Sequence, residues 1–186
     1  MNRKDLIDKL NSFATAERNN RDRIAAYVLL HPEIFPYLIE LTFEDRGRLS
    51  VKAAWILELV CIQNLSLIYP YLDLFSDQMK NISDESALRP LLKVTRFITN
   101  AYYTKKDPEI RTKLKQPAKE QFTEVCFDGL IEDHKIAAQV FAMDCLYDLG
   151  NEFEWIHPEL KQILIQNLPK GSKGYQSHAK KILKLL

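Results

Sequence analysis

The stretch His31–Leu41, "HPEIFPYLIEL", decides the fold class, because a similar stretch, "HPELKQILIQNL", returns at His157–Leu168. In both stretches a proline stands where an amphipathic run begins. Two further runs begin in the same way at Pro70 and Pro117, so that successive prolines are 38, 47 and 41 residues apart. Proline is favoured in the first turn of a helix, because its missing N–H would have no partner there. The series therefore predicts four helices that recur with a period near 42 residues.

A second helix is expected before each of these proline helices. Small residues mark three of the preceding helices, since small side chains let neighbouring helices approach closely. They are the pairs Ala25-Ala26, Ala53-Ala54 and Ala137-Ala138, and Leu91-Leu92 takes the corresponding place in the remaining helix. The second and third alanine pairs are 84 residues apart, which is twice the proline period. The sequence therefore predicts helices that recur as pairs.

Ten helices are expected in all, at residues 3–13, 21–30, 32–43, 50–64, 67–80, 84–103, 117–131, 133–149, 157–168 and 174–186. A period near 42 residues is typical of HEAT and armadillo repeats, in which one hairpin cannot bury its apolar face alone and stacks on the next. We expect an all-α, right-handed α-α superhelix of about four hairpins, forming one solenoid domain over residues 1–186. Residues 1–20 would hold an N-terminal capping helix and residues 170–186 a closing helix. An irregular helical bundle is the alternative.

Candidate capping residues agree with these boundaries. Ser50 precedes one expected helix, and Ser83 or Asp84 precedes another. Asp133 could cap the helix that ends at Gly150, and glycine is common just after a helix. In the two stretches that begin with His-Pro-Glu, the glutamate lies in the first turn, where the helix dipole favours an anion. The histidine is then the replaceable member of each stretch.

Composition limits the class of protein. The chain has 186 residues, of which 46% are hydrophobic and 27% charged, as expected for one globular domain. The formal net charge of +1 gives no strong field that would steer the protein onto nucleic acid or a membrane. The N-terminus lacks the apolar core of a secretory signal, and no apolar run reaches 18 residues, so no membrane span is expected.

Residues that could support catalysis or metal binding are scattered. The histidines show no H-x-x-x-H spacing, and His31 and His157 would lie three repeats apart, so we expect no metal site. Cys61, Cys126 and Cys145 lie in apolar helices without a neighbouring histidine, which predicts reduced core thiols in a cytoplasmic protein. No phosphate-binding loop is present. We therefore expect no catalytic residue and no cofactor.

Glu58 is the most informative charged residue, because it lies in the apolar stretch "AAWILELVCI" and would be costly to bury unpaired. The next helix of its kind carries Arg89, Lys93, Arg96 and Asn100 at spacings of four, three and four. If the two helices pack in parallel, Glu58 lies near the level of Lys93, and Arg89 or Arg96 could also reach it. Two interpretations stay open: an ion pair that fixes the register of the repeats, or a charged pocket on a groove.

Charge is segregated along the chain although its sum is small. Tyr102 and Tyr103 lie beside Lys105 and Lys106 in a basic segment that could contact a nucleic-acid backbone, whereas residues 128–159 are mostly acidic. Solvated helix ends are the other interpretation of the basic segment.

The aromatic residues that fall at helical spacing are expected in the core. They are Trp55, Phe97, Phe141 and Tyr147. Trp155 lies in the connection "NEFEWIHPEL", where it could staple the last hairpin by packing just before the cap.

Four segments resemble a known group of proteins. They are "KAAWILELV" (52–60), "PYLDLF" (70–75), "ALRPLLKV" (87–94) and "FEWIHPELKQIL" (153–164). The resemblance is to a family of short, uncharacterised HEAT-like helical repeat proteins from Bacteroidetes-type bacteria, and it covers nearly the whole chain. Members of that family often carry the label adenylosuccinate lyase. That enzyme is far longer and has a Ser-rich loop of the form S-S-x-M-P-x-K-x-N, whereas the nearest loop here, "KGSKGYQSH" (170–178), shares none of its order. We interpret the label as a misassignment.

A non-enzymatic interaction module is therefore the expected function. Stacked helical hairpins present an extended concave face, lined by the second helix of each pair, where a peptide or protein partner would lie. A nucleic-acid-associated protein, for example one similar to HEAT-like repair proteins, is the alternative, and a lyase is the third possibility. The sequence specifies neither the partner nor an oligomeric state.

Overall fold

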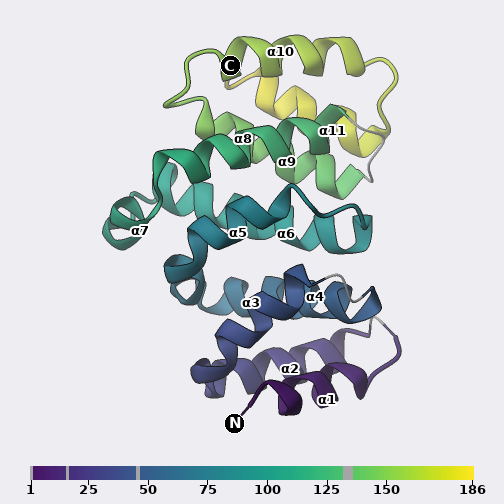
Figure 1. The fold of residues 1–186 in the computed structure, drawn as a ribbon. Helices are drawn as coiled ribbons and strands as arrows, with labels where there is room; N and C mark the ends of the chain where they lie inside the picture. The colour runs from purple at the N-terminus through teal and green to yellow at the C-terminus, as the bar shows by residue number, and fades with distance from the viewer. Residues whose placement is uncertain (1, 16, 45–46, 132–135) are drawn as a thin grey trace. The chain divides into compact units, whose positions relative to one another are not determined.

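A computed structural model of the chain describes residues 2–15, 17–44, 47–131 and 136–186. Within those ranges the chain forms eleven α-helices and no strand (Figure 1), which confirms the prediction of an all-α fold. Asp133, expected as a helix cap, lies outside the described residues.

The first helices and short turns run from the N-terminus to α6. They are α1 (Arg3–Asn11), α2 (Arg18–Leu30), the 3-10 turn η1 (Pro32–Ile34), α3 (Phe35–Phe43), α4 (Arg48–Gln63), the 3-10 turn η2 (Leu65–Tyr71), α5 (Leu72–Met79) and α6 (Glu85–Thr99). The remaining elements are the π-helical turn η3 (Asn100–Thr104), α7 (Pro108–Lys113), α8 (Gln116–Ile131), α9 (Ile136–Leu149), α10 (Ile156–Asn167) and α11 (Lys173–Leu183).

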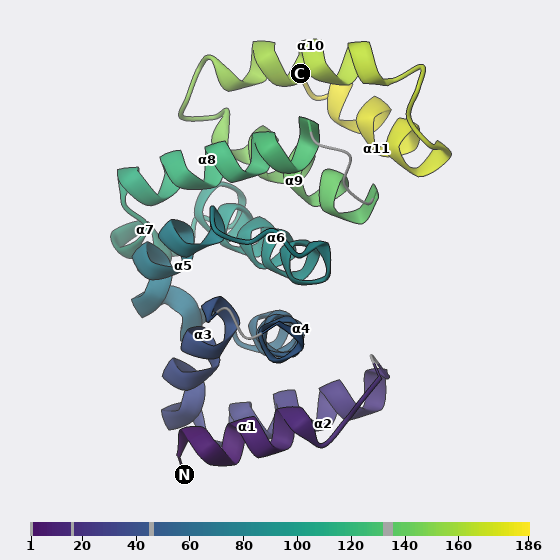
Figure 2. The ribbon, with the colours of Figure 1, turned by 45° about the vertical axis from the view of Figure 1, so that its right-hand side comes forward.

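The chain divides into two compact units, Met1–Val94 and Thr95–Leu186, and the division falls inside α6. In the first unit α1 lies beside α2 and α3 beside α4 (Figures 1 and 2). In the second unit α8 lies beside α9 and α10 beside α11 (Figures 1 and 2). The expected single solenoid domain over residues 1–186 stays a prediction.

Each unit is built around its own apolar core. In the first unit α4 is buried along most of its length, because both α3 and α2 pack on it. In the second unit α9 has the same central place, packed against α8, α10 and α11. Of the alanine pairs, both members are buried in α4, whereas only Ala25 in α2 and Ala138 in α9 are buried. At least one alanine of each pair is therefore in the core, as expected for small residues between packed helices.

The pairing of helices differs in part from the expected one. We expected each proline helix to be the second member of its hairpin, but α3 packs chiefly on α4 and α8 chiefly on α9, the helices that follow them. The chain turns by 102° between Arg18–Leu30 and Pro32–Phe43, which separates α2 from most of α3. The α10 helix behaves as expected and packs chiefly on α9, which precedes it.

Three of the four prolines lie where the sequence predicts them. Pro32 begins η1, Pro117 is the second residue of α8, and Pro158 is the third residue of α10, so none of them breaks a helical hydrogen bond. Pro70 instead lies near the end of η2, before α5 begins at Leu72. A short 3-10 turn accommodates it there without an α-helical hydrogen bond.

The predicted caps have mixed outcomes. The predicted capping role of Asp84 is confirmed, because its Oδ1 accepts from the N–H of Ser86 at 2.7 Å. The prediction that Ser50 caps α4 is wrong, because α4 begins at Arg48 and the Ser50 hydroxyl donates to the carbonyl of Glu44. A capping aspartate that the sequence analysis missed is Asp107, which accepts from two N–H groups at the start of α7.

The histidine of the second His-Pro-Glu stretch makes specific contacts that the sequence did not predict. The Nε2 atom of His157 lies 2.9 Å from the Tyr147 carbonyl oxygen, and the two rings stack at 5.5 Å. A Cβ on Gly150 would lie 2.0 Å from the His157 ring, so this glycine is required by the close approach of the ring rather than by helix termination alone. His157 therefore fixes the connection between α9 and α10.

Among the described residues, no single helix is long and apolar enough to cross a membrane. Two pairs of consecutive helical segments reach that length and composition only when each pair is taken together, and each pair is bent at its junction. They are Arg18–Leu30 with Pro32–Phe43 and Arg48–Gln63 with Leu65–Met79.

Candidate functional site

The Glu58 cluster, which consists of Glu58, Arg89 and Lys93, lies between α4 and α6 within the first unit. Glu58 is 5% exposed. Its Oε2 lies 3.1 Å from Arg89 Nη2, and its Oε1 lies 2.7 Å from Lys93 Nζ. Glu58 therefore lies at the level of Lys93, as expected, and Arg89 is the second partner of Glu58. Both cations are partly exposed, so the cluster places one buried negative charge beneath two hydrated positive charges.

Arg96 is not part of this cluster. Its Nε lies 2.5 Å from Oδ2 of Asp144 on α9, and its guanidinium lies over the Phe141 ring at 5.9 Å. The other carboxylate oxygen of Asp144 lies 2.8 Å from His178 Nε2 on α11. Asp144 therefore ties together three helical segments of the second unit.

The Lys119 network, which consists of Lys119, Glu152, Tyr102 and Tyr103, was not foreseen as a unit. The Lys119 side chain is 6% exposed, and its Nζ donates to both Glu152 oxygens at 2.8 Å and to the Tyr102 hydroxyl at 3.0 Å. The Tyr103 hydroxyl donates to Glu152 at 2.9 Å. The π-helical turn η3 carries both tyrosines and directs them toward α8 and the connection after α9.

The titration of this network fits a structural role. Burial opposes the charge on Lys119, but the hydrogen bonds to Glu152 and Tyr102 outweigh it and raise the pKa of Lys119. Burial and the hydrogen bond to Glu152 raise the pKa of the Tyr103 hydroxyl far above its ordinary value. Neither group can therefore act as a general base near neutral pH.

The basic residues next to the tyrosines stand apart from this network. Lys105 and Lys106 are exposed, as are Lys113 and Lys115 around α7. The two tyrosine rings pack against each other at 4.7 Å, and their hydroxyls bond Lys119 and Glu152, so they are not open platforms for bases. This arrangement favours the interpretation of the basic segment as a solvated surface.

Trp55 has a specific partner that the sequence analysis missed. Pro90 lies inside α6 and has no N–H to donate to the carbonyl of Ser86 four residues before it. Trp55 Nε1 on α4 donates to that carbonyl at 2.9 Å. The indole therefore replaces the hydrogen bond that the proline removes. Trp55 and the three other aromatics expected in the core are half-buried rather than fully buried.

The cysteines are core thiols, as predicted. Cys61, Cys126 and Cys145 are free and buried. Burial raises the pKa of the Cys61 thiol, and burial with the neighbouring Cys126 raises the pKa of Cys145, so thiolate chemistry is suppressed at both. Within the described part of the chain, no group of three His, Cys, Asp or Glu residues could hold a metal ion.

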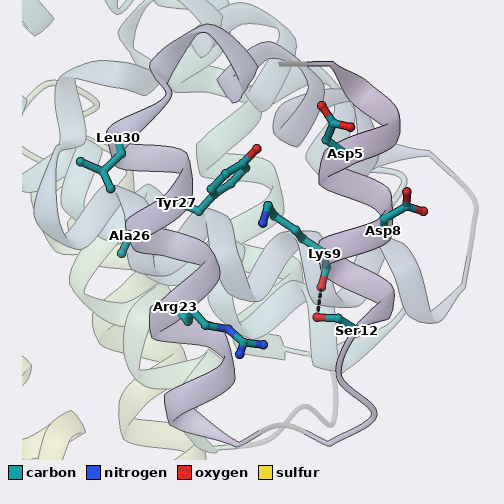
Figure 3. A pocket seen from close by; sticks show the side chains of 8 residues that line it. All are labelled: Asp5, Asp8, Lys9, Ser12, Arg23, Ala26, Tyr27 and Leu30. Atoms are coloured by element: carbon teal, nitrogen blue, oxygen red, sulfur yellow. Dashed lines mark hydrogen bonds between the residues drawn. The ribbon is translucent and has the colours of Figure 1, made fainter.

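A cleft of about 640 Å³ lies between α1 and α2 (Figure 3). Three of its charged and polar residues make contacts within the two helices. Asp5 accepts from the N–H of Asn2 as part of the α1 cap, Ser12 donates to the Lys9 carbonyl, and the Lys9 ammonium lies 3.9 Å from the Tyr27 ring centroid. These groups do not converge on one point where a ligand would be held.

The Trp155 cleft, of about 450 Å³, lies in the second unit between α8 and the connection to α10. It is lined by Glu120, Thr123, Glu124, Phe127, Phe153 and Trp155. Trp155 is 56% exposed, and its ring is stacked on Phe127 with centroids 5.5 Å apart and planes at 17°. The Thr123 hydroxyl donates to the Lys119 carbonyl at 2.9 Å, so this residue is bound to its own helix. The expectation that Trp155 would staple the last hairpin is not met, because the ring packs on α8 and stays largely exposed.

The chain belongs to the HEAT repeat domain family, which matches residues 8–186. A crystal structure of an engineered protein, a target of the Northeast Structural Genomics Consortium, is similar over 99% of this chain and 96% of that one, with 11% identity and a TM-score of 0.42. No curated protein matches the chain. The bacterial group named from the four segments stays a prediction.

Proposed function

We propose that this HEAT repeat protein is a non-enzymatic interaction module that binds a segment of a peptide or protein in the Trp155 cleft. The observation that carries the proposal is an exposed indole, stacked on Phe127, at the rim of a cleft that holds a third aromatic ring. Tryptophan is enriched among the residues that dominate binding energy at interfaces. Partner binding is also the general use of stacked helical repeats.

The size and the position of the cleft support this role. A volume of about 450 Å³ lies within the range of roughly 300–1,000 Å³ that is usual for ligand clefts. The aromatic rings are held by structured elements, since Phe127 lies on α8 and Trp155 directly precedes α10. The proposal places the partner on α8, the first helix of its hairpin, and not on the second-helix face where the sequence analysis expected it. A cytoplasmic location remains part of the proposal.

The test is a selection from a displayed random-peptide library on the wild-type protein, followed by affinity measurements on wild type and on Trp155→Ala. We expect enriched peptides whose affinity falls at least about tenfold for Trp155→Ala, the loss expected when an interface aromatic is truncated. Because the ring is largely exposed, the variant should keep the helical circular dichroism and the melting temperature of the wild type.

Leu74→Ala is the matched control. Leu74 is also a large, exposed apolar residue, 45% exposed, and it lies on α5 in the other unit. Peptide affinity should be unchanged in this variant. The proposal is wrong if no peptide is enriched, or if the enriched peptides bind Trp155→Ala as tightly as wild type.

A further inference from the structure

Two carboxylates share the α8 face that lines the Trp155 cleft. Glu120, Thr123, Glu124 and Phe127 are spaced at i, i+3, i+4 and i+7, so they lie along one side of the helix. Glu120 accepts from Gln116 Nε2 at 3.3 Å. Glu124 is exposed and has no ion-pair partner among the residues that the structure describes.

The cleft therefore carries uncompensated negative charge. Like charges at i and i+4 repel on a helix surface, and a cation placed between them relieves that repulsion. The lining contains no basic residue that could do so. Lys119 lies one residue before Glu120, but its ammonium is buried and bound to Glu152 and Tyr102. A ligand that complements the cleft must therefore bring positive charge.

The stacked aromatic rings favour a guanidinium over an ammonium as the cation in this cleft. Phe127 stacks on the Trp155 indole, and Trp155 as a residue is still 56% exposed, so part of its surface remains open in the cleft that Glu120 and Glu124 line. A guanidinium is planar, stacks on an aromatic ring, and donates two parallel N–H groups to one carboxylate. An ammonium is a strongly hydrated point charge and cannot do both in the same way.

We propose that the Trp155 cleft binds an arginine side chain of the partner peptide, with its guanidinium on the indole and paired with Glu124. This inference rests on the proposed function, because it specifies the partner of the same cleft. Glu120, which already receives a hydrogen bond from Gln116, contributes charge and a weaker contact.

The experiment uses peptides that were selected on wild-type protein and that need Trp155 for binding. We expect arginine at one fixed position in these peptides. Replacing this arginine by alanine should weaken binding about tenfold or more, and replacing it by lysine should weaken binding about threefold to fivefold, since lysine keeps the charge but not the planar contact. Glu124→Gln should weaken the arginine peptide about tenfold and should have little further effect on the alanine peptide.

Glu159→Gln is the matched control, because it removes one exposed carboxylate of α10 that does not line the cleft. It should leave the affinity unchanged at a fixed salt concentration. Peptides that need Trp155 but lack arginine, or that bind Glu124→Gln as tightly as wild type, would overturn the arginine assignment alone. A complete absence of Trp155-dependent peptides would instead overturn the proposed function.

Discussion

The Glu58 cluster and the Lys119 network hold their helices together with opposite charges in the buried position. In the first unit a carboxylate is buried beneath Arg89 and Lys93, which are partly exposed. In the second unit an ammonium is buried, and its partner Glu152 has a side chain that is 34% exposed. The buried member bears the larger desolvation cost in both cases. The comparison predicts that loss of the hydrated partner destabilises the fold more than loss of the buried charge itself, because the first change leaves a buried charge without a partner.

The largest effect is expected when the buried lysine loses its acid. Glu152→Ala should lower the free energy of unfolding by about 3 kcal/mol, since it leaves Lys119 charged, buried and bound only to the Tyr102 hydroxyl. Lys119→Met should cost about 1 kcal/mol, because it removes the buried charge and lets Glu152 hydrate. Urea denaturation followed by circular dichroism measures both variants.

Glu154→Ala is the control for this pair, because Glu154 is an exposed carboxylate of the same connection. Its effect should stay below about 0.5 kcal/mol. A larger loss of stability for Lys119→Met than for Glu152→Ala would break the comparison, since the buried charge itself would then be the stabilising element.

A smaller effect is expected for the buried acid of the first unit. Glu58→Gln keeps the shape of the side chain but removes its charge, while Arg89 and Lys93 remain free to hydrate. The free energy of unfolding should fall by about 1 kcal/mol, the usual value of a hydrogen bond to a charged group minus the desolvation that is relieved. Glu17→Gln, at an exposed position of the same unit, should have no measurable effect. Unchanged stability of Glu58→Gln would mean that the cluster does not fix the packing of α4 and α6.

The Glu58 cluster could be predicted from the sequence, whereas the Lys119 network could not, and the difference has a physical cause. An acid inside the apolar helix around Glu58 demands a partner, and the stripe of basic residues on α6 offers one at the expected level. Lys119 and Glu152 are 33 residues apart on elements that follow no common spacing. The two tyrosines that complete the network lie on the π-helical turn η3, which leaves no recognisable pattern in the sequence.

The sequence predicts only the α8 side of the Trp155 cleft. The spacing of Glu120, Thr123, Glu124 and Phe127 places them on one face of the α8 helix, which was correctly expected from Pro117 onward. The stacking of Trp155 on that face depends on the path of residues 150–155, which is set in turn by the close contact of Gly150 with the His157 ring. Helix α7 was missed for a different reason. Asp107-Pro108 is a cap followed by a first-turn proline, a signal that could have found it.

The smallest expected effect is on the pH dependence of stability, which should differ in sign between two carboxylates of the second unit, Glu152 and Asp148. Burial alone would raise the pKa of Glu152, but hydrogen bonds from Lys119 and Tyr103 outweigh it and lower that pKa below its ordinary value of 4.5. The stability that Glu152 contributes is therefore present above pH 4.5 and lost as the pH falls through the folded-state pKa. The difference in free energy of unfolding between wild type and Glu152→Ala should therefore decrease as the pH is lowered from 7 to 3.

Asp148 should show the opposite sign. Burial raises its pKa above the ordinary value of 3.8, in spite of the hydrogen bonds from Thr99 and Thr104, so its ionised form weakens the fold and protonation relieves the cost. Asp148→Asn should therefore raise the free energy of unfolding at pH 7 by up to about 0.5 kcal/mol, and this gain should vanish in acid as the wild-type carboxyl becomes protonated. Urea denaturation at pH 3, 5 and 7 measures both differences. If the Asp148→Asn difference grows on acidification, the buried carboxylate is stabilised by its two threonines more than burial penalises it.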